Sequence, residues 1–284
     1  MKNILVPTDF SENAEYAVRY ATELAAAWQA KVILMHAFQV TYASGYVPYE
    51  EIAAEKKLIQ KESEEKLKTM AHALTKAHVA HQVLCVDDIA VEAILNAIRE
   101  HHIELVVMGT KGASSMANVI FGSNTSHVIQ RATCPVLAIP EGTTYKKPKT
   151  LTYAAAYETG DIDIIKKLAD MAKPFHAQLN VLHITENSDD PAKDKADMKK
   201  FMDLVTEKID CNNISFQVMN GITMENVLED YVNQDAADIL ILSTHQRGFF
   251  GRVFGNSVTR QMSYHSRIPL MAFHFLKDSS VKLF

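Results

Sequence analysis

Apolar residues in the first half of the chain follow two alternating patterns. Between short apolar runs, apolar positions three and four residues apart predict amphipathic helices, and Ser11 followed by Glu12 is typical of a helix start. Strands that alternate with helices predict an α/β fold with a parallel sheet and right-handed crossovers. The short runs predict strands at residues 3–7, 32–37, 81–86, 104–109 and 135–140.

Each predicted helix has an apolar stripe that we expect to be buried against the sheet. In the first helix the stripe is Ala14, Ala17, Val18, Ala21, Leu24, Ala25 and Trp28. In the long, highly charged second helix it is Ile52, Leu58, Ile59, Leu67, Met70 and Leu74. In the third helix it is Val91, Ile94, Leu95 and Ile98, and a shorter helix from Gly122 to Arg131 precedes the last strand.

The second half of the chain repeats the first. Residues 2–36 align without a gap with residues 149–183, at an offset of 147 residues. Residues 109–135 align in the same way with residues 243–269, at an offset of 134 residues. The smaller second offset means that the first copy is longer in its middle. The chain therefore carries one α/β fold twice.

The repeat predicts where the second domain begins and which elements it contains. The polar stretch 141–150 separates the copies, so we expect domains at residues 1–141 and 149–277. The second helix stripe contains Ile164, Ile165, Leu168 and Met171, and strands are predicted at residues 180–185, 214–219, 238–243 and 269–274.

Length, composition and charge narrow the range of functions. The chain has 284 residues, enough for about two domains of roughly 150 residues. Its net charge of −5 gives no reason to expect binding to nucleic acid or to a membrane surface. Its apolar runs are too short to cross a bilayer, and its N-terminus lacks the apolar core of a signal peptide. Three widely spaced cysteines without a C-x-x-C pair fit a reduced, cytoplasmic protein.

Three glycines follow the fourth predicted strand at a fixed spacing. Gly109 and Gly112 allow a tight turn and a close approach of a ligand to the backbone. Gly122 then opens a helix, whose free N–H groups and dipole attract an anion, and the hydroxyl groups of Ser123 and Thr125 add donors. These residues resemble a phosphate cradle. The alternative is that the glycines simply end a strand and begin a helix.

Two familiar nucleotide-binding motifs do not occur in the sequence. No segment has the G-x-x-x-x-G-K-[ST] pattern of a Walker A loop. The turn after the first strand is Pro7-Thr8-Asp9, which lacks the glycines of a G-x-G-x-x-G dinucleotide fingerprint. A nucleotide site in this chain must therefore have another form.

The chain resembles a tandem universal stress protein, with two copies of that family's domain covering essentially all of its length. The family's nucleotide-binding members carry G-x2-G-x9-G-[ST], which Gly109, Gly112, Gly122 and Ser123 match in full. They also carry an Asp after the first strand, which Asp9 matches. The resemblance implies Rossmann-like, doubly wound domains of strand order 3-2-1-4-5. It also implies an adenine nucleotide as ligand, namely ATP with or without Mg²⁺.

The resemblance further implies which residues hold the nucleotide. Asp9 would meet the ribose or adenine end, the glycine loop the phosphates, and the backbone of the second strand the adenine. In this strand order the ends of the first and fourth strands flank one crevice, so these segments can meet although they are distant in sequence. The complete expected set is Pro7, Thr8, Asp9, His36, Ala37, Phe38, Met108, Gly109, Thr110, Lys111, Gly112, Gly122, Ser123, Asn124 and Thr125.

The second copy departs from this pattern. The aligned positions hold Ala156, Ser243, Gln246, Asn256 and Ser257 in place of Asp9, Gly109, Gly112, Gly122 and Ser123. Gln246 would place a side chain in the phosphate space, and Ala156 offers nothing to a ribose. Arg247 and Arg252 could bind some other anion, or they could be ordinary solvated charges. We expect the first domain alone to hold the nucleotide.

Three functions remain open at this point. The first is an ATP-binding stress-response protein, and the second is an interaction scaffold that binds no nucleotide. The third is a slow ATPase, but Asp9 is the one acid expected near the crevice, so efficient hydrolysis and catalytic residues are not expected. His72, His78 and His81 could bind zinc, but without a nearby set of Cys or carboxylate ligands we interpret them as surface residues and expect no metal site.

The last strand of each copy suggests how the domains assemble. Residues 136–139 and 270–273 are strongly apolar, and an exposed apolar edge invites pairing with another strand. Family domains commonly pair through these strands, so the resemblance implies an intramolecular pseudo-dimer. Homodimerisation and an unidentified protein partner stay open.

Overall fold

The computed structural model describes residues 1–40, 48–112, 121–210, 212–243 and 268–274. These residues form two compact units, one within residues 1–145 and the other from residue 146 on. Across the described ranges, every helix is too short or too polar to cross a membrane.

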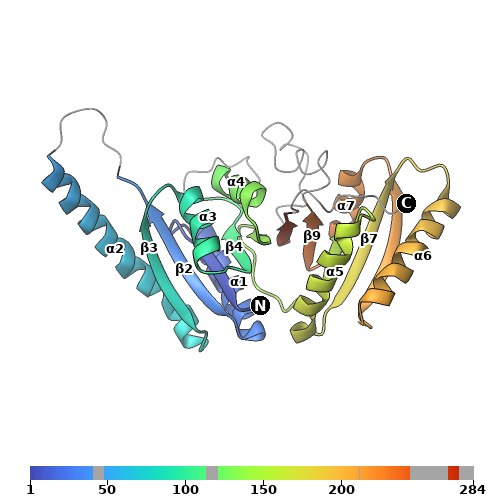
Figure 1. The fold of residues 1–284 in the computed structure, drawn as a ribbon, viewed down its shortest axis with the longest axis horizontal. Helices are drawn as coiled ribbons and strands as arrows, with labels where there is room; N and C mark the ends of the chain where they lie inside the picture. The colour runs from blue at the N-terminus through green and yellow to red at the C-terminus, as the bar shows by residue number, and fades with distance from the viewer. Residues whose placement is uncertain (41–47, 113–120, 211, 244–267, 275–284) are drawn as a thin grey trace. The chain divides into compact units, whose positions relative to one another are not determined.

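The first unit is a five-stranded parallel sheet with helices on both faces (Figure 1). Its strand order is β3-β2-β1-β4-β5, with Ile4 of β1 opposite Val32 of β2 and Leu105 of β4. The predicted strand order is thus confirmed. The elements are β1 (Asn3–Pro7), α1 (Glu12–Trp28), β2 (Lys31–Phe38), α2 (Tyr49–Lys76), β3 (His81–Asp87), α3 (Ala90–Glu100), β4 (Leu105–Gly109), α4 (Ser123–Arg131) and β5 (Val136–Ile139).

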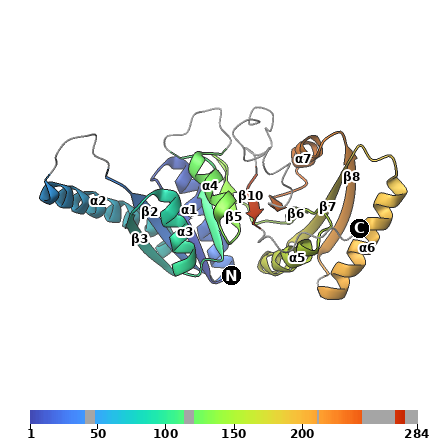
Figure 2. The ribbon, with the colours of Figure 1, turned by 45° about the horizontal axis from the view of Figure 1, so that its top comes forward.

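The second unit repeats this arrangement (Figure 2). Its parallel strands have the order β8-β7-β6-β9-β10, with Leu151 of β6 opposite Leu179 of β7 and Ile239 of β9. The elements are β6 (Thr150–Ala154), α5 (Thr159–Ala172), the 3-10 helix η1 (Lys173–Phe175), β7 (Gln178–Glu186), α6 (Pro191–Lys208), β8 (Ile214–Gly221), α7 (Met224–Asn233), β9 (Ile239–Ser243) and β10 (Leu270–Phe273). One doubly wound fold therefore occurs twice.

Local sequence signals explain where α1 begins and ends. The Ser11 side chain accepts a hydrogen bond from the Ala14 amide at 3.3 Å, which confirms the predicted cap. Gln29 ends the helix with a left-handed backbone, at φ 53°. The apolar stripe from Ala14 to Ala25 is buried, whereas Trp28 at the helix end is half-buried. The stripes predicted for α3 and α5 are buried as well.

The stripe predicted for α2 is wrong over half of the helix. Leu67 and Leu74 are fully buried, but Leu58 is 57% exposed, and Ile52, Ile59 and Met70 are half-buried. The reason is length: a helix of 28 residues is about 42 Å long, whereas the eight residues of β2 span about 26 Å. The first half of α2 therefore runs past the sheet (Figure 1).

The domain limits 1–141 and 149–277 stay predictions, and so does the pairing of the two domains.

Candidate functional site

A small cavity of about 120 Å³ lies at the carboxyl ends of β1 and β4, where the strand order of the first unit reverses. Open α/β sheets bind ligands at this point. Ligand sites usually measure about 300–1,000 Å³, so the enclosed part is small and would hold part of a nucleotide. We call this cavity the crevice. Of the fifteen residues predicted from the sequence, those that line it are Pro7, Thr8, Asp9, Ala37, Met108, Gly109, Lys111, Gly112, Gly122, Ser123, Asn124 and Thr125.

Hydrogen bonds fix the loop that carries Asp9. The Thr8 amide donates to the Met35 carbonyl at 2.8 Å, and Nδ1 of His36 donates to the Thr8 carbonyl at 2.8 Å. The Phe10 amide donates to the Thr8 hydroxyl at 3.0 Å. The Asp9 carboxylate accepts hydrogen bonds from both the amide and the hydroxyl of Ser11. The carboxylate is thus held at the crevice by the cap of α1.

Two glycines form the wall opposite this loop. A β-carbon at Gly112 would lie 2.6 Å from Oδ2 of Asp9, which is too close for any side chain unless the carboxylate moved. A β-carbon at Gly109 would lie 3.0 Å from the Asn13 carbonyl oxygen, so this glycine lets β4 end against α1. The glycine at 109 therefore serves packing, and the glycine at 112 keeps the space beside the carboxylate open.

The start of α4 forms a third wall. Gly122 is its N-cap, with an extended backbone and no side-chain cap, and its own amide donates to the Thr110 carbonyl at 2.7 Å. The first amides of a helix have no partner within the helix, so those of Ser123 and Asn124 can bind an anion. The Thr125 hydroxyl, expected to donate to a ligand, donates instead to the Gly109 carbonyl at 2.9 Å. Its role is to join α4 to β4.

Lys111 is the cation at the crevice. Its side chain is 22% exposed, and its Nζ atom lies 4.0 Å from Oε2 of Glu141, which is 64% exposed. Such a long and partly exposed ion pair holds a lysine weakly. The ammonium group therefore lies where a phosphate bound in the crevice could pair with it.

Strand alternation decides which residues of β2 face the crevice. Successive side chains of a strand point to opposite faces, so Ala37 lines the crevice together with Met35, which the sequence analysis missed. The His36 ring faces the other way and packs against Phe10, at a centroid distance of 4.3 Å. His36 and Phe38, expected to contribute their backbone, and the buried Thr110 are not among the residues that line the cavity.

The backbone of Ala37 has groups to offer to a ligand. The Met35 carbonyl accepts from the Thr8 amide just after β1, whereas the Phe38 carbonyl accepts from the Asp88 amide just after β3. Successive residues of β2 thus direct their backbone groups alternately toward β1 and toward β3. The backbone groups of Ala37, like those of Met35, face the side of β1. Because β1 ends at Pro7, opposite Met35, the Ala37 amide and carbonyl lie beyond its end.

Helix α3 supplies two further residues that sequence reasoning missed. Ala90 and Ile94 line the crevice from the first two turns of this helix. Ile94 was predicted as part of the buried stripe, but not as a site residue. The signal was available, because α3 begins just after the carboxyl end of β3. Met35, Ala37, Ala90 and Ile94 give one side of the crevice an apolar lining, and Ala14 also lines it.

In the second unit, a buried carboxylate occupies the position at which Ala14 lines the crevice of the first unit. At the repeat offset, Val6 and Ala14 correspond to Tyr153 and Asp161, which are 0% and 1% exposed. The Tyr153 hydroxyl donates to the Asp161 carboxylate. The other carboxylate oxygen accepts from the amides of Ala156, at 3.0 Å, and Glu158, at 2.9 Å. Burial raises the pKa of the Asp161 carboxyl, and also that of the Tyr153 hydroxyl.

This buried pair ties α5 to the loop after β6. That loop is the counterpart of the loop that carries Asp9 in the first unit. Ala156 occupies the position of Asp9, and Ser243, at the position of Gly109, is buried. Gln246, Arg247, Arg252, Asn256 and Ser257 lie outside the described residues. Within the described residues, the second unit has the methyl group of Ala156 where the first unit presents the Asp9 carboxylate.

The charges of the crevice suit a phosphate ligand. Among the described residues that line it, Asp9 is the one acid and Lys111 the one base. A Mg²⁺ ion there would have one protein carboxylate and would depend on phosphate oxygens and water for its other ligands. Within the described ranges, no three or more His, Cys, Asp or Glu residues are grouped so that they could hold a metal ion.

Comparison with known proteins identifies the family. The universal stress protein family matches the chain twice, over residues 1–140 and 158–274. The universal stress protein of the QAH/OAS sulfhydrylase 3′ region of Thermus aquaticus is 32% identical over 138 residues, which are 49% of this chain and 98% of that protein. Universal stress protein MJ0531 of Methanocaldococcus jannaschii is 28% identical over 151 residues, which are 52% of this chain and 84% of that protein.

A solved structure shows the same fold over the full chain. The crystal structure of a universal stress protein from Archaeoglobus fulgidus matches with a TM-score of 0.70 at 17% identity, covering 98% of this chain and 97% of that chain. The chain therefore belongs to the universal stress protein family and carries two copies of its domain in tandem.

Proposed function

We propose that the protein binds an adenine nucleotide, ATP in the first instance, in the crevice of its first domain as part of the stress response. One observation carries the proposal. Asp9 and the glycine motif, which begins one hundred residues later at Gly109, line one cavity at the point where the strand order reverses. This is where open α/β sheets bind nucleotides.

The residues of the crevice match the parts of a nucleotide. The apolar lining of Met35, Ala37, Ala90 and Ile94 suits a flat base, and the Ala37 backbone can read its polar edge. The Asp9 carboxylate can accept hydrogen bonds from ribose hydroxyls. Lys111 and the first amides of α4 can hold the phosphates.

The proposal assigns the ligand to the first domain alone. In the second domain, Asp161 and Tyr153 fill the space at the start of α5, and Ala156 replaces the carboxylate that would bind the sugar. A nucleotide there would have to displace a buried, fully hydrogen-bonded carboxylate, which is costly.

We also propose a cytoplasmic location, because the cysteines that the structure describes, Cys85 and Cys134, are both free.

Hydrogen exchange with and without ATP tests the assignment residue by residue. We expect ATP to slow exchange at the amides of residues 9–12 and 122–126, because these amides lie at the ribose and phosphate ends of the proposed site. The segment of the second domain that corresponds to residues 9–12, residues 156–159, should not change. Protection at residues 156–159, or no protection at residues 9–12 and 122–126, would contradict the proposal.

A further inference from the structure

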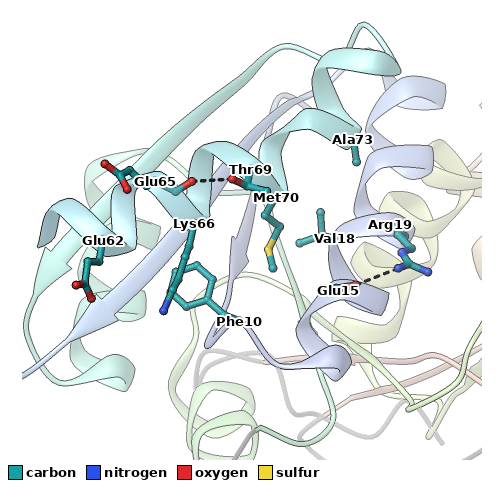
Figure 3. Close-up of a pocket in the computed structure, with 10 residues that line it drawn as sticks. All are labelled: Phe10, Glu15, Val18, Arg19, Glu62, Glu65, Lys66, Thr69, Met70 and Ala73. Carbon is teal, nitrogen blue, oxygen red and sulfur yellow. Dashed lines mark hydrogen bonds and ion pairs between the residues drawn. The ribbon is translucent and has the colours of Figure 1, made fainter. Parts of the chain in front are cut away.

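A second and larger cavity of the first domain lies between α1 and α2 (Figure 3). It measures about 600 Å³, which falls within the range of small-molecule sites. It shares no lining residue with the crevice, and the proposed function does not use it. We call this cavity the groove.

The floor of the groove is apolar and partly aromatic. Val18 of α1 is 3% exposed and faces the half-buried Met70 of α2 across the groove (Figure 3). At one end lies the Phe10 ring, which packs against the His36 ring at a tilt of 36°. Lys66 places its ammonium nitrogen 5.5 Å from the centre of the Phe10 ring. The protein thus already sets a cation over this aromatic face.

The rim of the groove has an excess of negative charge. On α1, Arg19 is neutralised by its ion pair with Glu15, at 3.0 Å. On α2, Glu62 and Glu65 stand at the rim (Figure 3), and neither takes part in an ion pair with any residue that the structure describes. The lining of the groove thus has three carboxylates, on Glu15, Glu62 and Glu65, against two cations, on Arg19 and Lys66, which leaves one negative charge in excess beside an apolar floor and an aromatic ring.

We propose that the groove binds an organic cation with an apolar body, such as an aryl-alkyl ammonium. The apolar body would lie on Val18 and Met70, and the ammonium would meet the carboxylates of the rim. The match rests on charge complementarity, because an anion would meet an excess of negative charge. A neutral apolar molecule would leave the carboxylates unused.

The second domain shows what a closed form of the groove looks like. Tyr157 occupies the position of Phe10 and stacks on His183 at 3.9 Å, as Phe10 packs on His36. There Phe201 of α6 stacks on Tyr157 at 4.5 Å and is fully buried. In the first domain, the flexible and exposed Lys66 covers the equivalent ring. The open groove thus follows from a charged side chain of α2 where α6 has an aromatic one.

Two matched probes test the proposal, 4-phenylbutylamine as the cation and 4-phenylbutanol as its uncharged analogue. Titrations followed by NMR at the methyl groups of Val18 and Met70 should show saturable binding of the amine, at least tenfold tighter than that of the alcohol. Equal affinity for the two probes, or no saturable binding of the amine, would overturn the proposal.

Variants separate a cation site from other interpretations. Glu62→Gln with Glu65→Gln should weaken amine binding at least fivefold, whereas the same change at Glu50 and Glu51, on the same helix but outside the groove, should not. Lys66→Met should tighten amine binding about threefold or more, because it removes a competing cation. Weaker binding of the amine to Lys66→Met would show that Lys66 assists the bound cation instead of competing with it, and would contradict the proposal. Melting temperatures check that each variant is folded.

Discussion

Asp9 and Phe10 are consecutive residues whose side chains line two different cavities. The Asp9 carboxylate borders the crevice opposite Gly112, while the Phe10 ring closes one end of the groove between α1 and α2. Phe10 has a left-handed backbone, at φ 63°, and its amide is tied to the Thr8 hydroxyl. A change in the packing of the Phe10 ring should therefore shift the backbone that positions the Asp9 carboxylate.

This relationship predicts that Phe10→Leu lowers the affinity for ATP. An aromatic pair contributes about 0.5–1.5 kcal/mol, so loss of the contact with His36 should loosen the Asp9 loop and weaken ATP binding about fivefold. Tyr157→Leu is the matched control, because it removes the equivalent ring from the second domain and should leave ATP binding unchanged. Calorimetric titration of both variants measures the effect. Equal changes in both variants would show that the loss is not specific to the Asp9 loop.

Gly112→Gln should abolish ATP binding and leave the fold intact. Any β-carbon here meets the Asp9 carboxylate at 2.6 Å, and glutamine is also the residue at the equivalent position of the second domain. Asp9 is exposed, so its side chain can move aside and the free energy of unfolding should change by about 0.5 kcal/mol or less. Titration with ATP and a thermal melt are the two measurements. Normal affinity in a folded variant would place the ligand elsewhere.

Ala14→Asp should close the crevice by copying the second domain. In that domain, Asp161 at the aligned position binds the Ala156 amide and fills the space at the helix start. We expect the affinity of Ala14→Asp for ATP to fall at least tenfold. Equilibrium binding of ATP to the folded variant decides this prediction, and an unchanged affinity would contradict it.

Asp161→Ala should destabilise the second domain without affecting nucleotide binding. The change removes three hydrogen bonds, one of them from the buried Tyr153 hydroxyl, which should cost roughly 3 kcal/mol. Chemical denaturation measures the loss. A change below about 1 kcal/mol would show that the buried pair contributes little to stability.

Cys134 should resist alkylation in the native protein. Burial raises the pKa of its thiol to about 12, so almost none of it is the reactive thiolate at pH 8. Burial also raises the pKa of Cys85, but this residue is only half-buried and should react before Cys134. Peptide mass spectrometry after timed treatment with iodoacetamide tests the order. Faster labelling of Cys134 would contradict the buried position.

The sequence predicts the sheet because strand and helix periodicities are local. The Ser11 cap, the strands and the stripes of α3 and α5 follow from patterns within single elements. The stripe of α2 fails because no local pattern tells where the sheet under a helix stops. Leu58 has helical spacing but lies beyond the strands.

The site residues that belong to local motifs were predicted, whereas those that tertiary packing brings to the crevice were not. The motif residues from Gly109 to Ser123 and the Asp9 loop are local signals, and the strand order brings them to one crevice. Ala90 and Ile94 come from α3, which carries no part of the motif. The Thr125 hydroxyl donates to the carbonyl of Gly109, sixteen residues away, and no local pattern predicts that bond. The pair of Tyr153 and Asp161 was missed because their contact depends on how α5 packs against β6.

Calorimetric titration with ATP tests the central claim most directly, because it gives the number of sites and the affinity together. The account predicts about one ATP per chain, with binding lost in Asp9→Ala and retained in Ser257→Ala, which changes the serine of the second domain that corresponds to Ser123. About two ATP per chain, or binding that survives Asp9→Ala, would contradict it.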